Sequence, residues 1–469
     1  MNSSASVGNR SPGFLPLLAA TAIGVYLLVI VGATTSLTDA AASCATWPAC
    51  EGSVLDGGGT TIAWVHRALA ALVGLGVLAV AAIGFRVETR YRVRLALAVA
   101  ALLYPVQVGI GAVTATMGTP ELVSAVHLLL AMGIFGGLLL ALAWSLEARF
   151  PTGEHEPSEP GEASDVESDS EAEPARRPVP TGWRATAGAY YSLTKPRLMW
   201  LLCLVAAAAM ALAAGPTLTV DIVIATLFGG VLAIGSAGTF NHVLERDVDR
   251  KMARTSERPL ATDVVPVRNA LAFGVLLGVA SLAVFFLFVN ALAALLGLTA
   301  IVFYSVIYTL VLKPNTVQNT VLGGAAGALP ALIGWAAVTG EIGLPALVLA
   351  AVIFCWTPAH FYNLALAYKA DYERGGFPMM PVVRGERTTR KHIVLYLGAT
   401  LLGAAVLATV GTLGWAYALT SVAFGALFLY AVIRLHREQT RRAAFRAFHA
   451  SNAYLGALLL VIVVDALAL

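Results

Sequence analysis

Long apolar segments separated by short polar stretches make up most of this chain. Thirteen of them approach the roughly 20 residues that a helix needs to cross about 30 Å of hydrocarbon. Four precede a polar interruption, at about 13–34, 62–85, 95–116 and 122–146, and nine follow it, at about 198–215, 220–240, 268–288, 291–312, 319–338, 343–367, 394–414, 417–434 and 453–469. The pattern predicts an all-α polytopic membrane protein, a four-helix bundle followed by a nine-helix bundle.

Composition supports this class, because only 12% of the residues are charged and 58% are hydrophobic, which excludes an ordinary soluble enzyme. The interruption at 151–183 is rich in Glu, Asp, Ser and Pro and has no apolar periodicity. We interpret it as a disordered linker, with an acidic interaction tail as the alternative. The expected domains are therefore 1–150, the linker 151–183, and 184–469.

The basic loops predict the orientation in the cell membrane, since cytoplasmic loops carry an excess of Lys and Arg. Four arginines lie between the second and third apolar segments, and the loops 241–267, 312–318, 368–393 and 435–449 are also basic. We expect these loops and the N-terminus in the cytoplasm. The loop that holds Cys44 and Cys50 then faces outside, where a disulfide can persist.

The stretch 241–260 holds the candidate chemistry. Asn241, Glu245 and Asp249 recur every fourth residue, which on a helix places them on one face. Carboxylates at this spacing repel each other, and Mg²⁺ bound together with substrate phosphates would relieve the repulsion. Arginines follow at the same spacing, at positions 246, 250, 254 and 258. The pattern favours a metal-bridged diphosphate, whereas the alternative is a basic topological loop whose carboxylates pair with its arginines.

Further polar residues lie at the same predicted side of the second domain. Lys195 and Arg197 enter its first helix, Lys313 begins the loop at 312–318, and Lys369 and Asp371 follow its sixth helix.

Four separated blocks give this domain a resemblance: NHVLERDVDRKMARTSERPL, LKPNTVQN with GGAAGALPALIGW, WTPAHFYNLAL, and DYERGGFPMMPVV. Together they resemble the heme O synthases (protoheme IX farnesyltransferases), a branch of the UbiA-type prenyltransferases, from about residue 193 to the C-terminus. The resemblance implies a nine-helix bundle that transfers farnesyl from farnesyl diphosphate to a vinyl group of heme b. It departs from the wider superfamily at His242 and Glu245, where Asp is usual, and at Gly375, which takes the last position of the second acidic motif.

The resemblance also implies roles for individual residues. Mg²⁺ would be held by Asn241, Glu245, Asp249 and Asp371. The leaving diphosphate would be bound by a set of basic side chains: Lys195, Arg197, Arg254, Arg258, Lys313 and Lys369. Two other functions stay open, a prenyltransferase with a quinone or another aromatic acceptor and a non-catalytic heme-binding membrane protein. Candidate partners are membrane lipid, heme A synthase and oxidase assembly proteins; no nucleic acid is expected.

His360 lies within an apolar helix, about two turns from its cytoplasmic end. Polar groups at such depth are functional by default, so contact with heme is one interpretation. The other is a histidine hydrogen-bonded to a neighbouring helix.

Two histidines mark the first domain. His66 and His127 lie about five residues inside the outer ends of the second and fourth helices, which run in the same direction, so they could ligate one heme. The segments C44ATWPAC50, His66-Arg67 and Q107VGIGAVT114 resemble one half of heme A synthase. That family commonly has Glu where Ala63 stands, which argues against heme oxidation by this half alone. We expect Cys44 and Cys50 to form a structural disulfide rather than a reactive pair.

Overall fold

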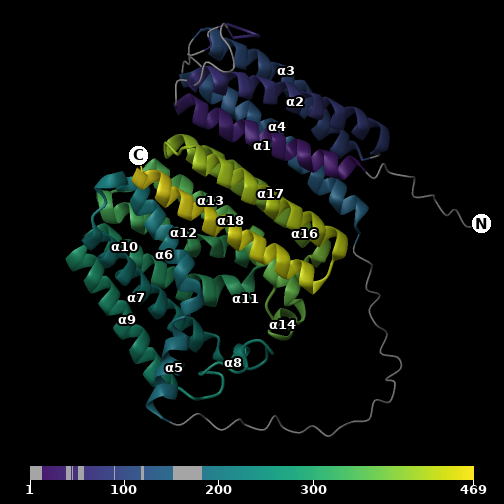
Figure 1. Ribbon diagram of the computed structural model, residues 1–469. Coiled ribbons are helices and arrows are strands. Elements are labelled where there is room, and N and C mark those ends of the chain that lie inside the picture. Colours follow the sequence, from purple (N-terminus) through teal and green to yellow (C-terminus); the bar gives the residue numbers. More distant parts are fainter. Residues whose placement is uncertain are drawn as a thin grey trace, which may run out of the picture.

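The computed structural model describes residues 13–37, 44, 46–50, 58–88, 90–117, 121–151 and 182–468. Within these residues every regular element is a helix, and thirteen helices are long and apolar enough to cross a membrane (Figure 1). The prediction of an all-α polytopic membrane protein is confirmed. The domain limits stay a prediction, because residues 152–181 lie outside the described part of the chain.

The first bundle contains the helices that precede residue 152. Its members are α1 (Phe14–Leu37), α2 (Gly58–Val87), α3 (Tyr91–Thr116) and α4 (Glu121–Arg149). Both α1 and α3 contact α2 and α4. Consequently α2 and α4 lie diagonally across the bundle, with their first turns at the same end.

The second bundle contains the helices that follow Gly182. The longer ones are α5 (Trp183–Leu193), α6 (Pro196–Ala214), α7 (Val220–Leu244), α9 (Val267–Phe288), α10 (Ala291–Val302), α12 (Asn319–Thr339), α13 (Leu344–Ala367), α16 (Gly385–Val410), α17 (Trp415–Glu438) and α18 (Arg441–Ala468). Short elements are η2 (Gly215–Thr217), α8 (Arg246–Asp249), α11 (Lys313–Asn315), α14 (Lys369–Arg374) and α15 (Met380–Val383). Between α10 and α11 the helix continues as a π-helix, η3 (Phe303–Leu312).

Two predicted boundaries are wrong. Helix α16 begins at Gly385 rather than near 394, and α18 begins at Arg441, so the predicted loop at 435–449 is helical from 441 onward. Average hydropathy misses the first turns of α16 because they are rich in charged residues, and those of α18 because they are amphipathic. In α18, Ala443, Ala444 and Ala447 are buried while the arginines around them are exposed.

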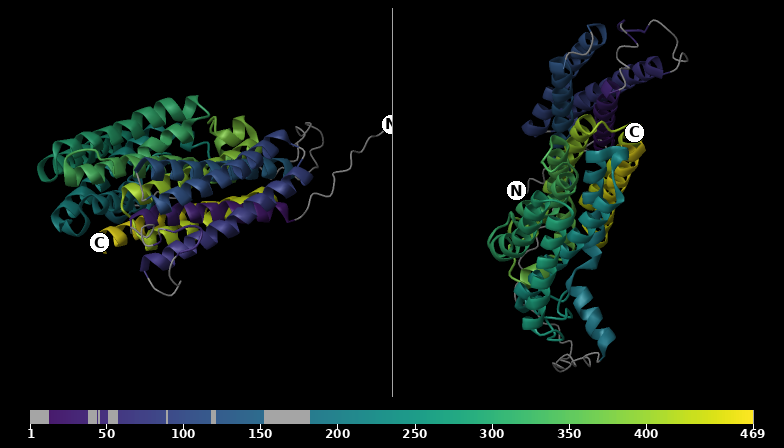
Figure 2. Two further views of the ribbon diagram at one scale, coloured as in Figure 1. Left: turned by 90° about the horizontal axis from the view of Figure 1, so that it is seen from above. Right: turned by 90° about the vertical axis from the view of Figure 1, so that its left-hand side faces the viewer.

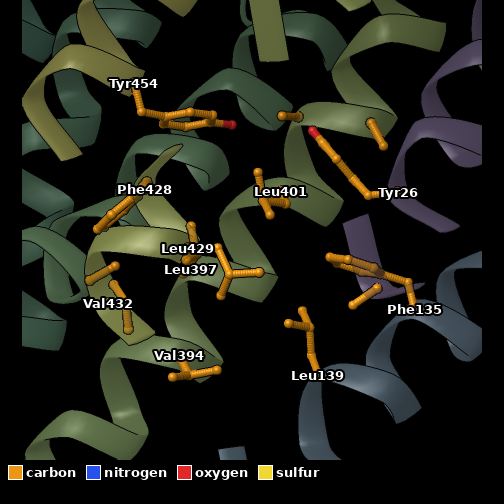
Figure 3. Packing of buried hydrophobic residues seen from close by; sticks show 14 of the residues in the cluster. Tyr26, Phe135, Leu139, Val394, Leu397, Leu401, Phe428, Leu429, Val432 and Tyr454 are labelled. Carbon is orange, nitrogen blue, oxygen red and sulfur yellow. The ribbon is translucent and has the colours of Figure 1, made fainter. Parts of the chain in front are cut away.

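The two bundles share one buried apolar interface. Helices α1 and α4 pack along α16 and α17. The views in Figures 1 and 2 show the first bundle beside these helices. Figure 3 shows Phe135 and Leu139 facing the side chains of α16. Within this apolar contact the Tyr26 and Ser421 hydroxyl groups lie 2.6 Å apart and share a hydrogen bond.

Ion pairs close the same interface at one end. Glu147, in the last turn of α4, accepts from Lys391 at 3.1 Å and lies 3.7 Å from Arg387, both in the first turns of α16. Glu386 in the same turn pairs with Lys369 of α14 at 3.2 Å. The C-terminal end of α4 therefore lies on the same side of the molecule as α14.

Replacing Gly398 by Val should loosen the contact between the bundles. A Cβ atom at this position would lie 2.5 Å from Cδ1 of the buried Leu139 side chain, and overpacking of this kind costs about 1–3 kcal/mol. We expect a lower thermal denaturation midpoint for the full chain in detergent. Gly136→Val is the matched control, because no atom lies within 4 Å of a Cβ built there. Equal midpoints for the two variants would contradict the packing argument.

Candidate functional site

Three side chains at the end of α7 share one buried face. Asn241, Glu245 and Asp249 are 2%, 5% and 1% exposed. Glu245 caps α7 with non-helical backbone angles. Even so, its N–H donates to Asn241 O at 2.9 Å, and Asp249 N–H donates to Glu245 O at 2.7 Å. The i to i+4 register therefore survives the break between α7 and α8, and the expected single face is present.

Each buried carboxylate of this face meets a cation. Lys313 donates to Glu245 Oε1 at 2.5 Å, and Arg258 donates to both oxygens of Asp249 at 2.8 Å. The Lys195 ammonium donates to Asn241 Oδ1, and to Tyr304 Oη at 3.0 Å. Segments far apart in sequence thus converge on one site, which we call the α7 cluster: Lys195, Asn241, Glu245, Asp249, Arg258 and Lys313.

Lys195 is held in an unusual backbone conformation. Its φ of 55° and ψ of 56° are left-handed, which costs a residue with a Cβ roughly 1–2 kcal/mol. The following Pro196 starts α6. Opposite lies Gly238 of α7, where a Cβ would stand 3.0 Å from Leu193 O and 3.3 Å from Lys195 Cγ. Glycine at this position lets the strained turn bring Lys195 against α7.

Burial and charge act in opposite directions on the ionisable groups here. Burial lowers the pKa of Lys195 to about 8, although Glu245 favours its charged form. Burial works to raise the pKa of Glu245, but Lys313 and Lys195 outweigh it and the pKa lies below its ordinary value. For Asp249 burial prevails and raises the pKa in spite of Arg258. The cluster thus holds cations that already lack full hydration, a condition that favours an anionic ligand.

The second acidic position lies beside this cluster. Asp371, 6% exposed, accepts from the Arg254 backbone N–H at 3.3 Å and pairs with Arg374. The Arg254 guanidinium lies 5.1 Å from the ring centroid of Tyr368 and reaches Tyr372 Oη at 3.4 Å. Arg254 therefore connects the loop after α8 to α14.

Not every predicted cation reaches the site. Arg197 is exposed on α6, and Lys369 pairs with Glu386. Arg246 and Arg250 form exposed pairs with aspartates outside the cluster. The arginine series of the sequence thus divides: Arg258 pairs with a buried carboxylate through its guanidinium, and Arg254 contacts Asp371 through its backbone N–H.

The sequence interpretation missed the residues of η3 that line this site. Tyr304 accepts from Lys195, Tyr308 stacks on Tyr304 with ring centroids 5.6 Å apart, and the Thr309 hydroxyl lies 2.9 Å from Asn241 Nδ2. Polar and aromatic residues near the charged end of a membrane helix were the available signal, but an α-helical spacing would not have placed them together.

The donor set suits a hard cation. Oxygen atoms of carboxylates and an amide are the ligands that Mg²⁺ takes, usually one or two carboxylates together with substrate phosphates. Within the described residues no group of three His, Cys, Asp or Glu side chains is close enough to hold a metal by itself.

His360 is hydrogen-bonded to a neighbouring helix. Its Nδ1 lies 2.7 Å from Ser451 Oγ of α18, and its ring stacks between Trp356 and Phe448, with centroids 4.3 and 4.2 Å away. Because Ser451 Oγ donates to Phe448 O at 2.7 Å, the proton of the first hydrogen bond comes from His360. Neutral His360 therefore keeps a lone pair on Nε2.

The histidines of the first bundle face its interior. His66 on α2 and His127 on α4 each have a buried Nδ1 without a hydrogen-bond partner. A Cβ at Gly32 would lie 3.7 Å from His66 Cε1, and one at Gly111 would lie 3.0 Å from His127 Cε1. Small residues of α1 and α3 thus leave room beside both rings.

The cysteine loop is fastened next to His66. Cys44 and Cys50 form a disulfide. The Arg67 guanidinium donates to Thr46 O at 2.8 Å and to Cys44 O at 3.1 Å. Arg67 therefore holds this loop over the end of the bundle where the histidines lie.

The chain is similar to known proteins in sequence and in fold. A model of the UbiA prenyltransferase family matches residues 199–456. Protoheme IX farnesyltransferase from Haloarcula marismortui is 64% identical over 465 residues, 98% of this chain and 100% of that protein. Protoheme IX farnesyltransferase 1 from Natronomonas pharaonis is 62% identical over 462 residues, 98% and 100% of the two chains. A solved structure of digeranylgeranylglyceryl phosphate synthase is similar in fold, with a TM-score of 0.51 and 16% identity over 60% of this chain and 99% of that one.

Removing Arg258 should destabilise the protein by leaving Asp249 buried and unpaired. For Arg258→Met we expect a loss of about 3 kcal/mol. Arg246→Met is the control, because its partner Asp247 is exposed and such pairs contribute less than about 1 kcal/mol. Chemical denaturation of both variants in detergent measures the difference. Equal losses would mean that the Asp249 pair is solvated like a surface pair.

Proposed function

We propose that this chain, which belongs to the UbiA prenyltransferase family, transfers a farnesyl group from farnesyl diphosphate to a vinyl group of protoheme IX and so makes heme O. The observation that carries the proposal is the α7 cluster, in which buried carboxylates and cations converge at one end of a membrane bundle. The acceptor is inferred from the names of the two relatives that match almost the whole chain.

The basic residues of the cluster act on the leaving group. When the bond between the allylic carbon and the diphosphate oxygen breaks, negative charge develops on the diphosphate. Lys195 lies just before α6, Lys313 begins α11, and Arg258 lies in the loop after α8, so cations from three segments surround that position. Arg254 adds a fourth cation, whose guanidinium lies over the rings of Tyr368 and Tyr372. Preorganised cations in a poorly hydrated site stabilise such charge more strongly than water does.

Asn241, Glu245, Asp249 and Asp371 are the residues that would hold magnesium. Bound there, Mg²⁺ would supply Lewis-acid stabilisation of the diphosphate. The carboxylates have a second task in the absence of substrate, because they neutralise Lys313 and Arg258.

In the proposed reaction the heme vinyl group replaces the diphosphate on the allylic carbon. The allylic C–O bond breaks, the heme vinyl group supplies two electrons for a new C–C bond, and water adds to the resulting cation and releases a proton. The products are diphosphate and a hydroxyethylfarnesyl side chain on the heme. His360, whose Nε2 keeps a lone pair, is the candidate residue for contact with the heme iron, since that nitrogen lacks the proton that a propionate would require.

The charge pattern supports one orientation of the protein in the cell membrane. The N-terminus and the loops that carry the α7 cluster and Asp371 face the cytoplasm. Farnesyl diphosphate would enter from that side. Heme A synthase and oxidase assembly proteins are the expected partners, because a heme product has to be passed on.

A second function is proposed for the first bundle, which is the binding of a resident heme b by His66 and His127. Their diagonal helices, buried Nδ1 atoms and neighbouring glycines fit a bis-histidine site. Such a heme would be low-spin and could carry electrons.

Asp249→Asn should abolish farnesyl transfer. The substitution removes a buried charge that the cations and the magnesium site both require, so we expect at least a 100-fold loss. Hemes extracted from membranes of a heme O-deficient host that expresses the full chain are analysed by mass. Asp247→Asn, at an exposed aspartate two residues away, should leave the farnesyl adduct in place. Full product from Asp249→Asn would reject the site, and a prenylated quinone in place of heme O would reject the acceptor.

His66→Ala should remove a low-spin bis-histidine heme spectrum without reducing farnesyl transfer. His66 lies in the first bundle, away from the α7 cluster. His449→Ala, an exposed histidine of α18, is the control. The reduced-minus-oxidised absorption spectrum of purified protein tests the ligand assignment. An unchanged spectrum would exclude His66 as a heme ligand.

A further inference from the structure

A stretch of π-helix lies where the sequence pattern predicts an ordinary membrane helix. In η3 the Lys313 N–H donates to Tyr308 O, a step of five residues. The Thr309 hydroxyl donates to Tyr304 O at 2.8 Å, over the same step. Long π-helical segments are rare, and short ones often accompany functional sites.

The π-helical register determines which side chains face the α7 cluster. An α-helix turns by about 100° per residue, so Lys313 would point to the side opposite Tyr304. A π-helix, with its i to i+5 hydrogen bonds, turns by only about 80° per residue, so nine residues complete about two turns. Tyr304 and Lys313 therefore share one face and contact Lys195 and Glu245 respectively. Thr309 lies near that face for the same reason.

Thr309 has a single hydroxyl proton, and the hydrogen bond that uses it determines how the Asn241 amide is oriented. The proton lies between Thr309 Oγ1 and Tyr304 O, and a carbonyl oxygen cannot supply one. The hydrogen bond of 2.9 Å between Thr309 Oγ1 and Asn241 Nδ2 must then use a proton of the amide. Asn241 is consequently turned with Nδ2 toward η3.

Lys195 gives an independent indication of the same amide orientation. An ammonium group can only donate, so the atom of Asn241 that it contacts must be the oxygen, Oδ1. The orientation of an amide is ordinarily ambiguous, but here a donor on one side and an acceptor on the other require the same one. Asn241, 2% exposed, and Thr309, 5% exposed, have little solvent with which to exchange these bonds.

We infer that Thr309, carried to α7 by the π-helical register of η3, is a positioning residue that keeps Asn241 Oδ1 turned toward the diphosphate–metal site. The inference rests on the proposed function, in which that oxygen is a metal ligand. Residues that orient a ligand commonly affect metal affinity by about 10–100-fold when they are changed. Without the Thr309 hydroxyl, Lys195 alone holds this orientation. Once the Lys195 ammonium pairs with the diphosphate, the amide can rotate and present Nδ2, which cannot bind a cation.

The test compares three variants of the full chain in detergent. Thr309→Val keeps the shape and removes the hydroxyl, whereas Thr309→Ser keeps the hydroxyl. Ser305→Ala is the matched control, because this buried hydroxyl of the same helix makes no hydrogen bond. Mn²⁺ binding is measured by electron paramagnetic resonance with farnesyl diphosphate present and heme absent.

We expect Thr309→Val to bind Mn²⁺ about 10-fold or more weakly, and Thr309→Ser and Ser305→Ala to bind it like the unchanged protein. In turnover, Thr309→Val should need more Mg²⁺ for half-maximal rate and recover most of its rate at saturating Mg²⁺. If the valine variant does not accumulate, Thr309→Ala is measured in its place with the same expectation.

Unweakened Mn²⁺ binding by Thr309→Val would overturn the inference, and so would an equal loss in Thr309→Ser, because packing rather than the hydroxyl would then be responsible. Failure of the unchanged protein to bind Mn²⁺ would overturn it as well. If the unchanged protein binds Mn²⁺ but makes no farnesylated heme, the proposed function fails while the positioning role of Thr309 stands.

Discussion

Charge buried at the end of a membrane bundle has to be neutralised by other protein groups, because lipid provides no counter-charge and water has limited access. The pairs Glu245–Lys313 and Asp249–Arg258 meet this requirement. Each joins elements that hydropathy alone would leave independent, α7 with α11 and α8 with the loop that follows it. The same pairs hold the cations in readiness for a diphosphate, so one arrangement serves both folding and ligand binding.

Two irregular features of the backbone of the second bundle lie beside these pairs. Lys195 has left-handed angles at the start of α6, and η3 departs from α-helical register just before Lys313. Neither feature is required for spanning a membrane, because regular α-helices can do this. Strained or rare conformations persist where the surroundings compensate for them, and they are found mainly at functional sites. Here both bring a lysine to the same face of α7.

The sequence predicts the spans well because each is a long apolar segment. An amphipathic helix end, such as the first turns of α18, is not detected when hydropathy is averaged over a window. The spacing of Asn241, Glu245 and Asp249 predicts their common face, since i to i+4 contacts are local. It cannot reveal that Lys313, 68 residues away from Glu245 in sequence, is its partner. Nor does any local pattern distinguish π from α register, so Thr309 could not be found from spacing.

The position of the first bundle separates the two proposed heme sites. Glu147, at the end of α4, pairs with Lys391 in the first turns of α16. Glu386, also in these turns, pairs with Lys369 of α14. This end of the first bundle therefore lies level with α14, which carries Asp371. His66 and His127 lie at the opposite end of α2 and α4, some 20 residues earlier, or roughly 30 Å at 1.5 Å per residue. A heme fixed between these histidines cannot reach the diphosphate end of the bundle. While a heme is ligated by both histidines of this proposed site, it is therefore out of reach of farnesyl transfer, and the proposed acceptor has to bind nearer the other end of the molecule.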